Sequence, residues 1–65
     1  MEDWQRRVIE EHEELLGKLV KLASFISGDS SFTALEAYQQ VLLRRQRSAM
    51  IEYEDVLAER IKDFA

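Results

Sequence analysis

The chain has no cysteine, no proline and only two glycines among its 65 residues. Without cysteine it can form neither a disulfide nor a thiolate metal site, which fits a reducing compartment. Few helix-breaking residues, together with 46% hydrophobic and 34% charged residues, are typical of a helical bundle and not of a disordered tail. The length limits the chain to a single domain over residues 1–65.

Long apolar runs are also missing. The longest are three residues, at 41–43 and 49–51, whereas a helix needs roughly 20 apolar residues to cross a bilayer. The acidic start, Met-Glu-Asp-Trp, lacks the apolar region of a signal peptide. A formal charge of −4 argues against non-specific binding to nucleic acid or an anionic membrane. We therefore expect a cytoplasmic protein with no membrane partner and no direct nucleic-acid partner.

Helical hydrophobic spacing fills two stretches, Trp4 to Ile26 and Leu35 to Phe64. The first predicts a helix over about residues 2–27, with Glu2 and Asp3 placed favourably at the positive end of its macrodipole. Its main apolar stripe is Val8, Leu15, Leu19, Leu22 and Ile26. Glu11 and His12 interrupt this stripe for about one turn, so we expect a partner or water there.

The second stretch predicts a helix over about residues 35–64 with two adjoining apolar sets. The first set is Leu35, Leu42, Met50, Tyr53, Leu57, Ile61 and Phe64, with Gln46 between Leu42 and Met50. The second set is Tyr38, Val41, Ala49 and Val56. Two apolar sets on one helix indicate packing against more than one neighbouring helix.

The joint between the helices covers residues 28–34. Gly28 suits a helix end because glycine accepts the left-handed conformation, and Thr33 with Glu36 matches a capping box that Phe32 would cover. The predicted fold class is therefore all-α, an antiparallel helical hairpin. Two helices alone cannot enclose a core, so we expect the hairpin to form a homo-oligomeric helical bundle with copies of itself.

Folding the chain at residue 31 places positions whose numbers sum to about 62 opposite each other. Five positive charges then lie near the loop end: Lys18, Lys21, Arg44, Arg45 and Arg47. Seven negative charges lie at the middle: Glu10, Glu11, Glu13, Glu14, Glu52, Glu54 and Asp55. An ordinary solvated surface with i,i+4 pairs explains this pattern. Alternatively, the basic zone of one copy packs against the acidic zone of another.

The basic zone also contains groups suited to a small ligand. Arginine binds phosphate, an aromatic ring stacks on a base, and an amide reads a base edge. The candidate ligand-binding residues are Lys18, Lys21, Arg44, Arg45, Gln46, Arg47 and Tyr53. Secondary candidates are Trp4, Arg7, Tyr38 and Arg60; Arg6, Arg7 and Arg60 meet at the open end of the hairpin. The competing interpretation makes Gln46 a residue that fixes register and makes the rings core residues.

Catalysis has little support in the sequence. His12 is the only histidine, and no second histidine or cysteine completes a catalytic or metal site. There is no Glu-x-x-His motif, glycine-rich phosphate loop, nucleophile elbow or zinc motif. We expect no enzymatic activity, no cofactor and no metal.

Many positions also match a known family. They are Trp4, Gln5, Arg7, Val8, Glu11, Glu14, Leu15, Lys18, Leu19, Lys21, Leu22, Phe25, Ile26, Phe32, Leu35, Gln40, Leu42, Leu43, Gln46, Met50, Tyr53, Leu57, Arg60 and Ile61. This pattern, which covers almost the whole chain, resembles a family of very small proteins from tailed bacteriophages that are related to a protein of crAss-like phages. The chain departs from it at Glu36, where proline is frequent.

The resemblance implies a phage accessory protein made in the host bacterial cytoplasm, where such proteins often counter host defence. One reading is a homo-oligomeric sponge that sequesters a nucleotide-derived immune signal. A second is an acidic decoy, of the DNA-mimic or anti-CRISPR type, that inhibits a host defence protein through its mid-rod carboxylates. A third is a structural assembly module that offers an apolar helix face.

Overall fold

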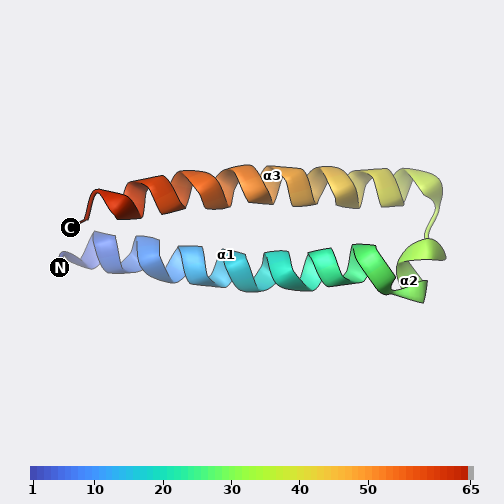
Figure 1. Cartoon of the computed structure of the whole chain (residues 1–65), viewed down its shortest axis with the longest axis horizontal. Helices are drawn as coiled ribbons and strands as arrows, with labels where there is room; N and C mark the ends of the chain where they lie inside the picture. Colours follow the sequence, from blue (N-terminus) through green and yellow to red (C-terminus); the bar gives the residue numbers. More distant parts are fainter. Residues whose placement is uncertain (65) are drawn as a thin grey trace.

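The computed structural model describes residues 1–64 and shows two long helices side by side with a short helix at the turn (Figure 1). The elements are α1 (Asp3–Gly28), α2 (Ser30–Thr33) and α3 (Ala37–Lys62). The molecule is a rod of 46 × 15 × 14 Å, with both termini at the same end (Figure 1). The predicted all-α antiparallel hairpin is confirmed.

Local sequence explains where α1 begins. The backbone N–H of Glu2 donates to Oε1 of Gln5 at 2.8 Å, which satisfies one donor that the helix itself leaves unpaired. Asp3 adds negative charge in the first turn, where it interacts favourably with the helix dipole.

The turn differs from the sequence-based prediction. No glycine has positive φ, so Gly28 ends α1 without the left-handed conformation, and extended Asp29 follows it. The Asp29 side chain accepts from the backbone N–H of Ser31 at 2.8 Å and caps α2. Because this cap starts a new helical turn at once, the chain needs no left-handed glycine to reverse direction.

The predicted capping box at Thr33 and Glu36 is wrong. Thr33 instead donates its hydroxyl to the carbonyl oxygen of Ser30 at 2.9 Å, and Glu36 precedes α3 without a side-chain cap. The link from α2 to α3 is held by Gln40, whose Nε2 donates to the carbonyl oxygen of Leu35 at 2.9 Å. As a result α3 begins at Ala37, two residues later than the sequence predicts.

The observed register is also shifted. His12 lies opposite Glu54 and Trp4 lies opposite Phe64, so the numbers of facing residues sum to 66 and 68 and not to about 62. The cause is the turn, because α2 and its linker occupy residues 29–36 and move the point of reversal past residue 31. The basic and acidic zones remain at the predicted levels because the shift is only about one helical turn.

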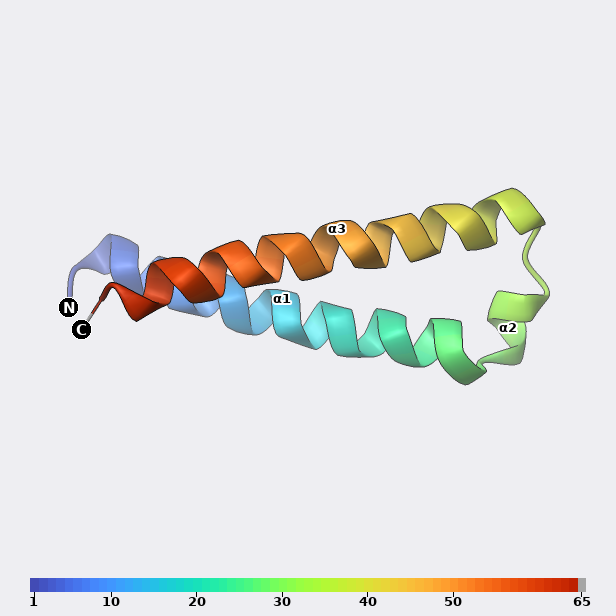
Figure 2. The same cartoon turned by 45° about the horizontal axis from the view of Figure 1, so that its top comes forward.

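The core of a single hairpin is small, as expected for two helices. Among residues 1–64 the buried hydrophobic side chains are Val8, Leu15, Phe32 and Leu57. Three of these form one cluster with half-buried Met50, Ile61 and Phe64 toward the open end. Figure 2 shows α1 and α3 farther apart at the α2 end, where Phe32 packs edge-to-face on Phe25 with ring centroids 5.7 Å apart.

The face of α3 that packs on α1 agrees with the predicted stripe at Met50, Leu57, Ile61 and Phe64 and differs from it at three other levels. It consists of Leu43, Arg47, Met50, Glu54, Leu57, Ile61 and Phe64, all buried or half-buried. The predicted Leu42, Gln46 and Tyr53 are exposed. At these three levels the residue that faces α1 is the next one along the chain: Leu43, Arg47 and Glu54. Two of these three residues are polar. An apolar pattern could not find them, because arginine can bury its alkyl stem at a helix contact while its charged head reaches water.

Candidate functional site

Arg44 and Arg45 form the centre of the basic zone, on the half of α3 nearest the turn. Together with Val41 and Ser48 they line a hollow of about 390 Å³. These four residues are spaced i, i+3, i+4 and i+7, so their side chains surround one patch of a single helix face. The hollow is shallow and mostly apolar, and two arginine side chains line it beside Val41.

The hairpin turn supports one of these arginines. The guanidinium of Arg44 lies 5.1 Å from the ring centroid of Phe32, within the range of a cation–π contact. Phe32 is only 2% exposed and is held by Phe25 of α1. A buried ring from α2 thus orients an exposed guanidinium on α3, although that side chain lies on the surface.

The five basic residues of this zone lie in the half of the rod nearest the turn, without carboxylate partners. Close contacts between basic and acidic side chains among residues 1–64 join Arg6 to Asp3, His12 to Glu54 and Lys62 to Glu59. None includes the basic zone, which is Lys18, Lys21, Arg44, Arg45 and Arg47. Four of the five are exposed, and Arg47 is half-buried. Uncompensated positive charge of this kind attracts an anion such as a phosphate group.

The amide and ring assigned to this site lie outside the hollow. Gln46 is exposed and its Nε2 lies 3.9 Å from Sδ of Met50. Tyr53 is 43% exposed and lies nine residues beyond Arg44, about 14 Å along a helix axis. Tyr38 is 63% exposed. One hairpin therefore brings the two arginines together but does not place an amide or a tyrosine ring against them.

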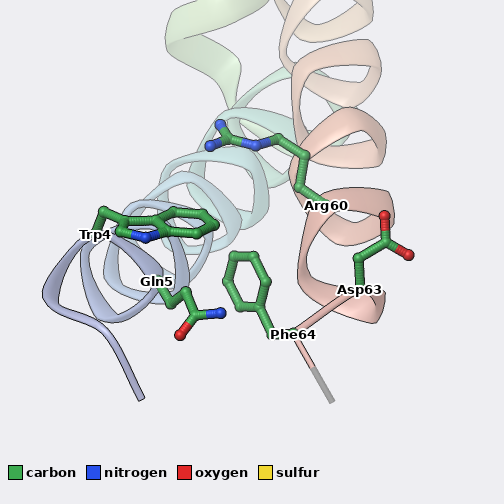
Figure 3. A pocket seen from close by; sticks show the side chains of 5 residues that line it. All are labelled: Trp4, Gln5, Arg60, Asp63 and Phe64. Atoms are coloured by element: carbon green, nitrogen blue, oxygen red, sulfur yellow. The ribbon is translucent and has the colours of Figure 1, made fainter.

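A second hollow, of about 380 Å³, lies at the open end and is lined by Trp4, Gln5, Arg60, Asp63 and Phe64. Figure 3 shows the side chain of Arg60 extending above the indole of Trp4. The rings of Trp4 and Phe64 meet edge-to-face, with centroids 5.3 Å apart. The structure therefore brings together two of the secondary candidates, Trp4 and Arg60.

Arg7 does not line this hollow, although the sequence grouped it with Arg60. The sequence-based prediction missed the other lining residues, Gln5, Asp63 and Phe64. Phe64 was assigned to the core, and an accurate register would have placed it beside Trp4.

The middle of the rod contains a polar contact that the sequence did not predict. Nε2 of His12 lies 2.9 Å from Oε1 of Glu54, with the two side chains 19% and 26% exposed. This contact fills the gap that Glu11 and His12 leave in the apolar stripe of α1. His12 thus links the helices, and the other mid-rod carboxylates, Glu10, Glu11, Glu13, Glu14, Glu52 and Asp55, are exposed.

Two other kinds of feature are absent from the described part of the chain. Residues 1–64 contain no group of three or more histidine, aspartate and glutamate side chains that could hold a metal ion. The helices described here also lack a stretch long and apolar enough to cross a membrane.

Comparison with known proteins identifies the family. A family model described as Sequestin matches residues 2–63. The chain belongs to the Sequestin family. No curated protein and no solved structure matches it. The name Sequestin is consistent with a sequestering role, which is a binding function, and it does not state what is bound. The class of ligand must therefore be inferred from the residues that line the two hollows of this Sequestin chain.

Proposed function

We propose that this member of the Sequestin family is a phage accessory protein that binds a nucleotide-derived immune signal in the host bacterial cytoplasm and keeps it from its effector. It acts by stoichiometric binding as a helical homo-oligomer, with no catalytic step. The observation that carries this proposal is the hollow at Arg44 and Arg45, where two arginine side chains lie beside an aliphatic one.

The chemistry of this hollow suits a phosphorylated ligand. Guanidinium groups bind phosphate oxygens through paired, charge-assisted hydrogen bonds, and Arg44 is oriented beforehand by its contact with Phe32. Lys18 and Lys21 add positive charge from α1 at the same level of the rod. The resemblance to small phage proteins supports the proposed setting, and the family name supports sequestration.

Native mass spectrometry with a panel of cyclic dinucleotides, cyclic trinucleotides and ADP-ribose derivatives tests this function. We expect a discrete oligomer that gains a fixed number of copies of one nucleotide. Arg44→Ala and Arg45→Ala should each weaken binding about 10-fold to 100-fold, because a hydrogen bond to a charged group contributes about 1.5–3 kcal/mol. Lys62→Ala is the matched control, since Lys62 is an exposed basic residue at the other end of α3. Equal loss in all three variants would contradict the assignment.

A second candidate function is an acidic inhibitor of a host defence protein. It is supported by the exposed carboxylates at the middle of the rod, Glu10, Glu13, Glu14, Glu52 and Asp55. A net charge of −4 is small for imitating a polyanion, which is why we rank this candidate second. Neutralising these glutamates should abolish anti-defence activity only if this candidate is correct.

A further inference from the structure

One stripe of α3 is exposed in the single hairpin, and its positions are spaced symmetrically along the helix. It consists of Tyr38, Leu42, Arg45, Ala49, Tyr53, Val56 and Arg60, and every member is exposed. Their spacings of three and four residues keep them on one helix face. Counted from Ala49, the other members lie four, seven and eleven residues away in both directions. The positions of the stripe, but not its residue types, are therefore symmetric about Ala49.

A stripe with symmetric positions can pair with a second copy of itself in the antiparallel direction if the mirrored residues are complementary. A two-fold axis requires that the same patch on both subunits be self-complementary. With the axis at Ala49, Leu42 of one copy faces Val56 of the other. These two side chains are 46% and 49% exposed in the single hairpin. The pairing covers both of them twice, once on each side of the axis.

The polar members of the stripe are also complementary in this arrangement. Arg45 of one copy faces Tyr53 of the other, which gives arginine beside an aromatic ring at two places. Tyr38 faces Arg60, whose side chain in the single hairpin lines the hollow at Trp4. Glu52, which is exposed beside the stripe, comes near Arg45 of the second copy as an opposite charge. A parallel arrangement would instead place Arg45 against Arg45 and Arg60 against Arg60, so charge favours the antiparallel one.

The residue at the centre allows the helices to approach. Ala49 has no side chain beyond Cβ, and interaxial distances between packed helices shrink with the side chains at the contact. Tyrosines and arginines lie farther along the stripe, where diverging helices leave more room. We propose that two copies of this chain pair through this face, α3 against α3 in antiparallel orientation, with a two-fold axis at Ala49.

This pairing has a consequence for the ligand site that rests on the proposed function. In one hairpin Arg45 and Tyr53 are eight residues apart, about 12 Å along the helix. In the pair, Arg45 of one copy lies next to Tyr53 of the second copy. A guanidinium and an aromatic ring then come together beside the hollow that contains Arg44, which a single chain does not achieve.

Cysteine crosslinking tests the interface directly, because the chain has no cysteine of its own. Ala49→Cys places one thiol from each copy on the axis, so mild oxidation should give a disulfide-linked dimer as the main product. Val56→Cys is the matched control on the same stripe. Its two thiols would be separated by 14 residues along the helices, about 21 Å, and a disulfide needs Cα atoms within about 7 Å. We expect at most a small fraction of dimer from it.

Mixing two variants tests the direction of pairing. Leu42→Cys protein mixed with Val56→Cys protein should give a crosslinked heterodimer, while each alone stays uncrosslinked. Self-crosslinking of Val56→Cys at the rate of Ala49→Cys would indicate a parallel pair and overturn the proposal. A monomeric mass for the unmodified protein by native mass spectrometry would also overturn it and assign this face to a different protein. No ligand is present in these experiments, so failure of the interface and failure of nucleotide binding are distinguished.

Discussion

Removal of the Leu57 side chain should damage the hairpin strongly, because Leu57 is 1% exposed and lies in the core cluster with Val8 and Leu15. Burial of a leucine side chain contributes about 1.5–3 kcal/mol. Truncation also leaves a cavity, so Leu→Ala substitutions in cores cost about 2–5 kcal/mol. We expect Leu57→Ala to lower the free energy of unfolding by about 3 kcal/mol.

A loss of this size is a large part of the total free energy of unfolding. At roughly 0.05–0.15 kcal/mol per residue, a domain of this size has about 3–10 kcal/mol of stability. A loss of 1 kcal/mol shifts the melting temperature of a small domain by about 4–8 °C. Leu57→Ala should therefore lower the midpoint by about 12–24 °C in thermal melts followed by circular dichroism at 222 nm.

Leu42→Ala is the matched control, with the same atoms removed from the same helix at a side chain that is 46% exposed in the hairpin. Because Leu42 does not face α1, its truncation should act only through contacts between copies. We expect its effect to shrink as the protein is diluted, while the effect of Leu57→Ala persists. Equal losses for the two variants in dilute solution would refute the assignment of the buried face.

Two other changes test local features of the rod. Gly17 is an exposed residue inside α1, and a Cβ added there meets nothing within 4 Å; Gly17→Ala should therefore raise the free energy of unfolding by about 0.5–1 kcal/mol. Urea titration measures this gain, and a destabilised Gly17→Ala variant would indicate an unexpected neighbour at that position. For the contact between His12 and Glu54, a double-mutant cycle with alanine should give a coupling of about 0.5–1.5 kcal/mol. The exposed pair of Lys62 and Glu59 should give less than about 0.5 kcal/mol, and equal couplings would show that burial does not strengthen the inter-helix contact.

The candidate sites could be predicted from the sequence only in part. The basic zone was found because lysine and arginine positions can be counted directly, and the level at which they lie changes little when the register moves by one turn. The hollow at the open end was not found, because it depends on which residue of α3 lies beside Trp4. The contact of Arg44 with Phe32 was missed for a similar reason, since Phe32 reaches α3 only through the short helix α2.

The sequence by itself determined the two long helices, the antiparallel hairpin and the small core. Helical periodicity depends only on residues near each other in the chain, and chain length limits how large a core can be. Only the tertiary structure decided which face of α3 packs on α1 and where the chain reverses. Apolar residues occupy more than one face of α3, so periodicity alone could not choose between Leu42 and Leu43. The structure shows that choice in the contact of His12 with Glu54 and in the partial burial of Arg47. Both depend on the position of the opposite helix.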